Sequence, residues 1–173
     1  MEQKENRISF DFDGSLDSFF NGTPNPLQKQ TRDYVRRLMK RGYEIFIVTR
    51  RFGPELSDFV QPNEHEKVYA VAEELGIKKE NVFFTNRKWK YEKLDELNVC
   101  MHIDDDPEEC YHINTNTPNI KTILLTEDNW EEQLIQTISK HNGLSIWIDG
   151  NSNLINILVF LFVMIFFTFL LFA

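Results

Sequence analysis

The chain has 173 residues, which is enough for one domain with a sizeable core and too few for two. Its 27 acidic and 19 basic residues give a net charge of −8, which argues against a broad nucleic-acid-binding face, because phosphate backbones need clustered Lys and Arg. The two cysteines, Cys100 and Cys110, lack CxxC spacing, so we expect free thiols in a reducing compartment.

Short apolar runs alternate with helical patterns through residues 7–140. The predicted strands are Ile8–Asp11, Glu44–Thr49, Val82–Thr85, Val99–Ile103 and Lys121–Leu125. The predicted helices are Pro26–Arg41, Glu64–Leu75, Tyr91–Leu97 and Asn129–His141. This alternation predicts an α/β fold of the three-layer, Rossmann-like kind, in which helices cover both faces of a mostly parallel five-stranded sheet.

Residues 154–173 form an apolar segment without a charged residue. As a helix, twenty residues would rise about 30 Å, the thickness of the hydrocarbon core of a bilayer. A buried core helix is the alternative, but the segment is apolar on every face. We therefore predict a transmembrane helix at 154–173 (a single-pass tail anchor), a linker at 141–153, and a domain at 1–140 that faces the cytosol. The charged and polar residues 1–7 do not resemble a signal peptide.

Polar side chains follow four of the predicted strands, at the edge of an open α/β sheet where ligands bind. They are Asp11, Asp13, Gly14 and Ser15 after the first strand, Thr49, Arg50 and Arg51 after the second, Lys88, Lys90 and Lys93 after the third, and Asp104, Asp105 and Asp106 after the fourth. Because the carboxyl ends of parallel strands share one edge, we expect these residues to gather there.

A gathering of this kind favours one type of chemistry. Unpaired carboxylates repel and raise one another's pKa, and a divalent cation relieves this; ligands that are all oxygen favour Mg²⁺. A nearby lysine and hydroxyl suit a phosphoryl group, which needs charge neutralisation and positioning. Aspartate can act as the nucleophile and form an aspartyl-phosphate.

Each motif taken alone has a plainer interpretation. Asp13 and Gly14 are typical of a turn, and acids before Pro107 are typical of a helix N-terminus. Arg50 and Arg51 are open between substrate contact and a solvated surface pair. The combination at strand ends favours a site. His102 lies inside a predicted strand, where we expect a packed residue.

Four segments, in this order, resemble the motifs of the haloacid dehalogenase (HAD) superfamily of phosphatases. They are "ISFDFDGS", in which Ser9 interrupts the apolar run, "IFIVTR", "KWKYEKL" and "MHIDDDPEE". The resemblance covers about residues 7–126, and the first and fourth segments are the specific ones. It implies a HAD-like fold, Mg²⁺ as the cofactor, and a phosphatase, that is, a hydrolase of phosphoric monoesters acting through an aspartyl-phosphate.

The resemblance also implies roles for individual residues. Asp11 would attack phosphorus and contact the metal, and Asp13 would be the general acid and base, with its backbone carbonyl at the metal. Thr49 would hydrogen-bond the phosphoryl oxygens. Asp105 would be the carboxylate ligand of Mg²⁺, with Asp104 as its support or its alternative. Glu109 takes the place of the family's last acid.

The lysine of the third motif is open among three candidates. Lys90 is the first choice because it could start the helix and point toward the strand ends; Lys93 is the second, and Lys88 is also within reach. We assign Lys90 to catalysis. Ser15, Arg50 and Lys93 are the expected substrate-binding residues.

The spacing of the motifs bears on the substrate. Between Asp11 and Thr49 there is room for one helix and a short flap at 17–25, and no cap domain fits there. Capless relatives tend to have open sites that admit large substrates such as phosphoproteins, and the predicted membrane span adds lipid phosphates to the candidates. The expected partner is a phosphorylated small molecule, a phosphoprotein or a lipid phosphate, without extended nucleic-acid binding. The alternatives are a nucleotidase or nucleic-acid-end phosphatase of the same superfamily, and a catalytically silent, membrane-tethered interaction protein on a HAD scaffold.

Overall fold

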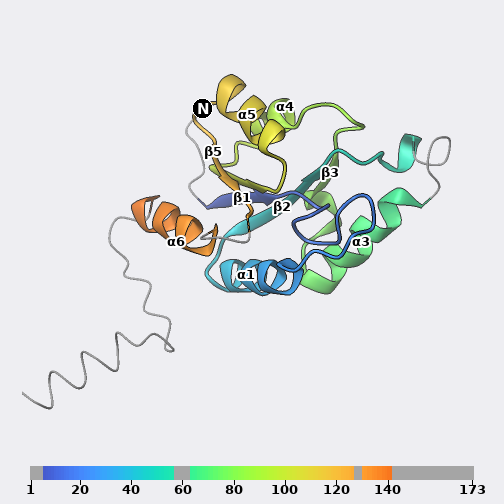
Figure 1. Ribbon diagram of the computed structural model, residues 1–173, viewed down its shortest axis with the longest axis horizontal. Helices are drawn as coiled ribbons and strands as arrows, with labels where there is room; N and C mark the ends of the chain where they lie inside the picture. The colour runs from blue at the N-terminus through green and yellow to red at the C-terminus, as the bar shows by residue number, and fades with distance from the viewer. Residues whose placement is uncertain (1–5, 57–62, 127–129, 142–173) are drawn as a thin grey trace, which may run out of the picture. The chain divides into compact units, whose positions relative to one another are not determined.

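A five-stranded sheet lies at the centre of the fold (Figure 1). The computed structural model describes residues 6–56, 63–126 and 130–141. The chain divides into two compact units, residues 1–133 and 134–173, and the sheet belongs to the first. The strand order is β3-β2-β1-β4-β5, and every neighbouring pair is parallel.

The five predicted strands are confirmed, with ends that differ by two residues at most. The strands are β1 (Arg7–Phe10), β2 (Glu44–Thr49), β3 (Val82–Phe84), β4 (Met101–Asp104) and β5 (Lys121–Leu124). In the centre of the sheet, Ile8, Ser9 and Phe10 of β1 are fully buried, as expected for a strand covered on both faces. An all-parallel sheet of this order fits a Rossmann-like fold.

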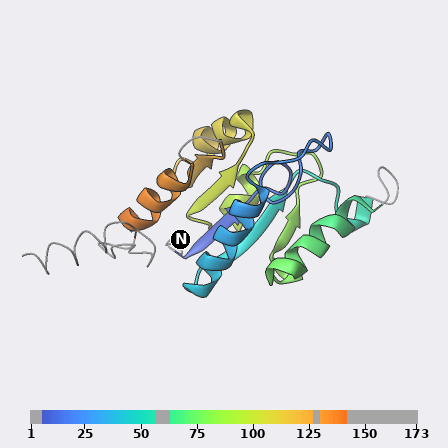
Figure 2. The same ribbon diagram turned by 60° about the horizontal axis from the view of Figure 1, so that its bottom comes forward.

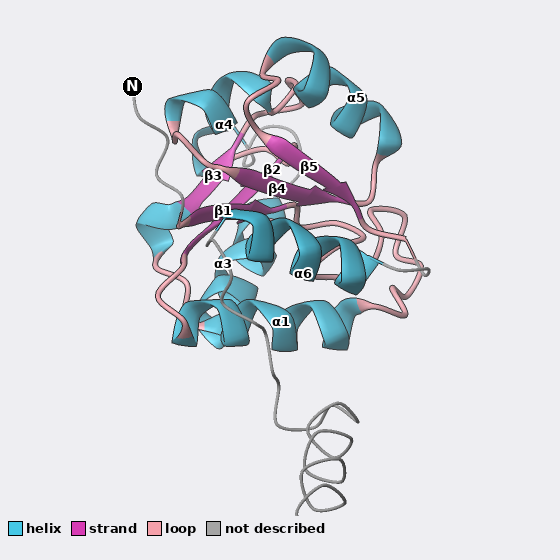
Figure 3. Ribbon diagram, turned by 90° about the vertical axis from the view of Figure 1, so that its left-hand side faces the viewer, coloured by secondary structure: helices cyan, strands magenta, loops and turns pink. Residues whose placement is uncertain are grey.

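Helices cover both faces of the sheet. They are α1 (Gln28–Lys40), α3 (Glu64–Leu75), α4 (Tyr91–Glu96) and α5 (Pro107–Asn116), with a 3₁₀ helix η1 (Lys79–Asn81) before β3. A further helix, α6 (Trp130–His141), begins in the first unit and continues into the second. Figure 3 shows α4 and α5 on one face and α1 and α3 on the other. The predicted three-layer arrangement is therefore present.

Under α4 and α5, buried apolar side chains form one cluster with the sheet. Its members are Phe46, Val48, Leu94, Val99, Ile113 and Ile120. On the opposite side of the sheet, Tyr34 of α1 packs edge-to-face against Trp130, with ring centroids 5.6 Å apart. Each helix layer thus contributes large buried side chains that hold the strands in register.

Helix α5 is not among the predicted helices. Its buried face carries only Glu109, Cys110 and Ile113, which is too sparse an apolar pattern to indicate a helix. Its start is nevertheless well marked, because Asp106 accepts a hydrogen bond from the backbone N–H of Glu108 at 2.8 Å and Pro107 occupies the first turn. The plainer interpretation of the acids before Pro107 as a helix N-terminus is thus correct for Asp106.

The strand order decides where a ligand can bind. The chain runs from β1 through β2 to β3 on one side and then returns to place β4 on the other side of β1. The loops after β1 and β4 therefore diverge, which is the position where open α/β sheets bind ligands. Figure 2, in which α1 and α3 come forward, shows the loop that follows β1 at this end of the sheet.

Within the described residues, no helix is both long enough and apolar enough to cross a membrane. The predicted transmembrane helix at 154–173 lies outside those residues. The predicted linker at 141–153 also lies outside them, apart from His141 at the end of α6.

Candidate functional site

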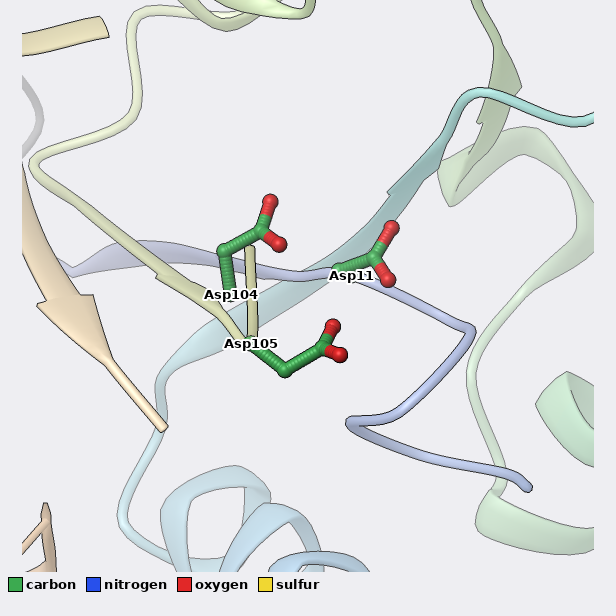
Figure 4. A group of neighbouring side chains, drawn as sticks. All are labelled: Asp11, Asp104 and Asp105. Atoms are coloured by element: carbon green, nitrogen blue, oxygen red, sulfur yellow. The ribbon is translucent and has the colours of Figure 1, made fainter. Parts of the chain in front are cut away.

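Three carboxylates meet at the carboxyl ends of β1 and β4. Asp11, Asp104 and Asp105 each offer an oxygen atom, and these atoms lie within 4.8 Å of one another (Figure 4). They line a cleft of about 610 Å³. The other lining residues are Asp13, Phe19, Phe20, Asn21, Thr49, Arg50, Arg87, Lys90, Asp106 and Glu109. The strand-end residues expected from the sequence thus largely gather in one place.

Lys90 is the lysine that enters this cleft. Its buried ammonium Nζ lies 2.5 Å from Asp11 Oδ1 and 2.6 Å from Asp104 Oδ2. Burial opposes the charge, but Asp104 and then Asp11 and Glu109 raise the pKa of Lys90 above its usual value, so the ammonium stays charged. Because Lys90 is the residue just before α4, the start of the helix directs its side chain toward the strand ends.

The pKa values of the three carboxylates do not shift in the same direction. Burial and the neighbouring Asp104 raise the pKa of Asp105 to about 6, and burial also raises the pKa of Asp11, against the pull of Lys90. Burial works against the charge of Asp104 too, but Lys90 and His102 prevail and hold its pKa well below the usual range. When all three carboxylates are ionised, the cluster has two negative charges beyond the one that Lys90 balances, and a divalent cation would favour this ionised form.

The raised pKa of Asp105 predicts how stability depends on pH. Between its ordinary value of 3.8 and about 6, the folded state holds a proton that the unfolded state has released, so the free energy of unfolding falls as pH rises through this range. We expect Asp105→Asn to remove this fall, so that without Mg²⁺ it is more stable than the wild type at pH 7. Urea unfolding of the full chain at pH 4 and pH 7 measures the difference. If the wild type instead gained stability relative to Asp105→Asn between pH 4 and pH 7, the raised pKa of Asp105 would be contradicted.

Gly14 makes room for Asp105. A Cβ atom at Gly14 would lie 2.1 Å from Asp105 Oδ2, and Gly14 has φ +69°, in the left-handed region. The Asp13–Gly14 pair therefore forms a turn, as its plainer interpretation has it. The same turn lets the carboxylate of Asp105 approach the backbone after β1.

A buried series of hydrogen bonds, through His102 to Ser9, supports Asp104 from within the sheet. His102 Nε2 lies 2.9 Å from Asp104 Oδ2, and His102 Nδ1 lies 2.8 Å from Ser9 Oγ. We assign the ring proton to Nε2 because an ionised carboxylate only accepts hydrogen bonds. Burial lowers the pKa of His102, which keeps the imidazole neutral.

Sequence reasoning treated His102 as a packed residue and did not link it to the site. The signal was present in Ser9, the polar residue that interrupts the apolar run of β1, since Ser9 and His102 are register partners on neighbouring strands. A paired serine and histidine inside two apolar strands indicates a buried hydrogen bond. Only the register, however, says that the two residues face each other.

Arg51 is part of the site rather than of a solvated surface pair. Its Nη2 and Nε lie 2.7 Å and 3.0 Å from the two oxygens of Asp13, a two-pronged contact that fixes the carboxylate. The Arg51 guanidinium also lies over the ring of Phe12, 4.9 Å from its centroid. Asp13 is thereby held at the wall of the cleft.

Thr49 and Arg50 line the cleft as the sequence led us to expect. The hydroxyl of Thr49 is buried and accepts a hydrogen bond from the backbone N–H of Arg51 at 3.3 Å. Glu109 is buried behind Lys90 and accepts from the backbone N–H of Lys90 at 2.7 Å. Burial raises the pKa of Glu109, although Lys90 and Arg50 oppose this.

Two of the expected substrate-binding residues do not line the cleft. Lys93 pairs instead with Glu96 on α4, and its ammonium lies 5.4 Å from the centroid of the Phe83 ring. Ser15 is fully buried in the turn after Gly14, and its hydroxyl makes no hydrogen bond with the described residues. Both lie near the site in sequence, but helix geometry turns Lys93 away and the turn at Gly14 buries Ser15. Lys88, the third candidate lysine, is exposed.

The predicted flap borders the cleft. Its base is held by Asn25, whose amide donates to the backbone carbonyls of Gly14, Ser15 and Asp17 at 2.7, 3.2 and 3.3 Å. Its tip, residues 19–21, lines the cleft. Phe20 at this tip is 53% exposed, so the flap presents an aromatic ring at the cleft mouth.

Comparisons with known proteins do not identify a family or a function for this chain. No protein-family model matches the chain, and no curated protein matches it. Among solved structures, the chain is similar to an uncharacterized protein from Corynebacterium glutamicum ATCC 13032 Kitasato, with 15% sequence identity and a TM-score of 0.46. That match covers 82% of this chain and 98% of the other.

Proposed function

We propose that this protein is a Mg²⁺-dependent phosphomonoester hydrolase of the HAD type, in which Asp11 attacks phosphorus. The observation that carries the proposal is the group formed by Asp11, Asp104, Asp105 and Lys90. It joins a candidate nucleophile, an all-carboxylate set of metal ligands and a buried cation for phosphoryl oxygens. Few other chemistries need all three within one cleft.

The residues present fit a hard divalent cation. Their donors are all carboxylate oxygens, and with all three ionised the cluster would carry two negative charges beyond what Lys90 balances. Asp104 already accepts hydrogen bonds from Lys90, from His102 and from the backbone N–H of Asp106. Asp11 and Asp105 would therefore be the principal ligands, with Asp104 as their support. When bound, Mg²⁺ would neutralise charge on the phosphoryl group and orient it.

The side chains of the cleft supply each step of the reaction. Asp11 attacks phosphorus and the bond to the leaving oxygen breaks, while Asp13, which has first taken up a proton from solvent, gives that proton to the leaving oxygen. Asp13 then takes a proton from water, which attacks the aspartyl-phosphate and releases phosphate and Asp11. Lys90 and Thr49 hold the phosphoryl oxygens in both steps. Arg51 keeps the carboxylate of Asp13 in position.

Phosphate release from an aryl phosphate by the full chain, kept in mild detergent and compared with and without Mg²⁺, tests this function. A broad panel of nucleotides, sugar phosphates, phosphopeptides and lipid phosphates extends the test to the substrate class. A folded protein that turns over none of them would favour the alternative of a silent interaction protein on the same scaffold.

We also propose that residues 154–173 anchor the protein in a membrane. The support is the length of the segment and its lack of charged residues. A fluorescent protein fused to residues 141–173 is expected to pellet with membranes and to resist carbonate extraction. The matched control replaces Phe160 and Phe166 by Lys, which places two charges in the segment and should release the fusion. Recovery of the unmodified fusion in the soluble fraction would contradict the anchor.

A further inference from the structure

The cleft is polarised along the edge of the sheet. The acids Asp11 and Asp105 follow β1 and β4, whereas Arg50 and Arg87 come from the loops after β2 and β3. Asp11 follows β1, which has β2 and β3 on one side and β4 on the other. The two arginines therefore lie on one side of Asp11, and β4 lies on the other. The candidate nucleophile thus has the carboxylates of β4 on one side and a positive flank, formed by Arg50 and Arg87, on the other.

Aromatic rings hold both guanidiniums of this flank. Arg50 lies over Trp89, 4.4 Å from the ring centroid, and Trp89 in turn stacks on His112 at 3.9 Å. Arg87 lies 4.6 Å from the ring centroid of Phe20 and 5.1 Å from that of Phe52. Stacking on a ring fixes the plane of a guanidinium. Arg87 Nη2 also donates to Oε1 of the buried Glu64 at 2.9 Å, so Arg50 supplies the N–H groups that would meet an anion and Arg87 adds charge beside them.

The two loops are also tied to each other through their backbones. The backbone N–H of Arg87 donates to the carbonyl of Arg50 at 2.8 Å, and Nη2 of Arg50 donates to the carbonyl of Arg87 at 3.2 Å. Asn86 and Arg87 have φ values of 53° and 67°, which residues other than glycine seldom adopt. The hydrogen bonds keep the backbone in this unfavourable conformation, which brings Arg87 to the cleft.

Arg50 has unused binding capacity inside the cleft. Its Nε is buried and makes no hydrogen bond with the described residues. Its nearest carboxylate oxygen, Oε2 of Glu109, is 3.8 Å from Nη1, beyond hydrogen-bond distance. A buried donor without a hydrogen-bond partner is rare in native proteins. The Arg50 side chain as a whole is 34% exposed and lines the cleft, so it is accessible to an anion there.

We infer that the positive flank binds a second phosphate group, so that the substrates are small phosphomonoesters with another phosphate on the leaving group. The inference rests on the proposed function, because it takes the reacting phosphoryl group to sit at Asp11. A volume of about 610 Å³ accommodates a molecule of sugar-bisphosphate size. Guanidinium groups bind phosphate through two parallel hydrogen bonds, which matches the fixed plane of Arg50, and the charge of Arg87 lies beside it.

Fructose 1,6-bisphosphate and fructose 6-phosphate form a matched pair of probes that differ by one phosphate. With the full chain and Mg²⁺, the ratio of their kcat/KM values for phosphate release is expected to favour the bisphosphate by about tenfold or more, the usual size of a charge-assisted contact. Arg50→Gln and Arg87→Gln should each bring this ratio close to one. Arg36→Gln, which changes a cation on α1 away from the cleft, should leave the ratio unchanged.

A binding measurement separates this inference from the proposed function. Calorimetric titration of the Asp11→Asn chain with both sugars, in Mg²⁺, reports their relative affinities without turnover. Tighter binding of the bisphosphate that is lost in Asp11→Asn/Arg50→Gln supports the inference even where no wild-type activity is found. Turnover without any preference between the two sugars, or a preference that both arginine variants retain, overturns the inference and leaves the hydrolase proposal standing.

Discussion

Asp11→Asn is expected to lower phosphate release by the full chain about a thousandfold or more. The substitution replaces the carboxylate that we propose as the nucleophile by a neutral amide of almost equal size, so the proposed covalent intermediate could not form. The effect should appear in kcat, because substrate binding depends on Lys90, Thr49 and the arginines of the cleft. Steady-state kinetics with an aryl phosphate in saturating Mg²⁺ measures it.

The control for this variant is Asp95→Asn, which makes the same chemical change at an exposed position of α4. Asp95→Asn should retain full activity, and both variants should show the circular dichroism spectrum of the folded wild type. If Asp11→Asn kept a substantial part of the wild-type kcat, Asp11 would not be the nucleophile.

Lys90→Met should destabilise the protein by about 3–5 kcal/mol at pH 7 without Mg²⁺, because it leaves Asp11 and Asp104 buried beside each other without their cation. Methionine matches the length of the lysine stem, so lost packing contributes little. Urea unfolding of the full chain, followed by tryptophan fluorescence, measures the change in the free energy of unfolding.

Two further measurements show whether charge is the cause. Lys88→Met, at an exposed position two residues earlier, should change stability by no more than about 0.5 kcal/mol. Saturating Mg²⁺ should restore part of the stability of Lys90→Met, since a divalent cation would stabilise the carboxylates that the lysine no longer pairs. Equal unfolding midpoints for the Lys88 and Lys90 variants would rule out the buried ion pairs as a source of stability.

The sequence alone predicted most of the secondary structure and the edge of the sheet where the site lies. Strands such as Glu44–Thr49 are continuous apolar runs bounded by polar residues, and that pattern is local. The positions of Asp11, Thr49 and Asp105 at the carboxyl ends of the first, second and fourth strands followed from it, since parallel strands share one carboxyl edge. Helix α5 escaped prediction because its short buried face includes a glutamate, Glu109, whose partner Lys90 comes from another segment.

What only the tertiary structure decided are the contacts between segments that are far apart in the chain. Sequence position favoured Lys90 over Lys93 and Lys88 without excluding either, and the direction in which α4 begins is what brings Lys90 to Asp11. The pairs Ser9–His102 and Asp13–Arg51 depend on strand register and on the turn at Gly14. The positive flank of Arg50 and Arg87 exists because the sheet places β3 and β2 next to β1. Register and strand order are properties of the whole packed sheet, and no local pattern of residue types encodes them.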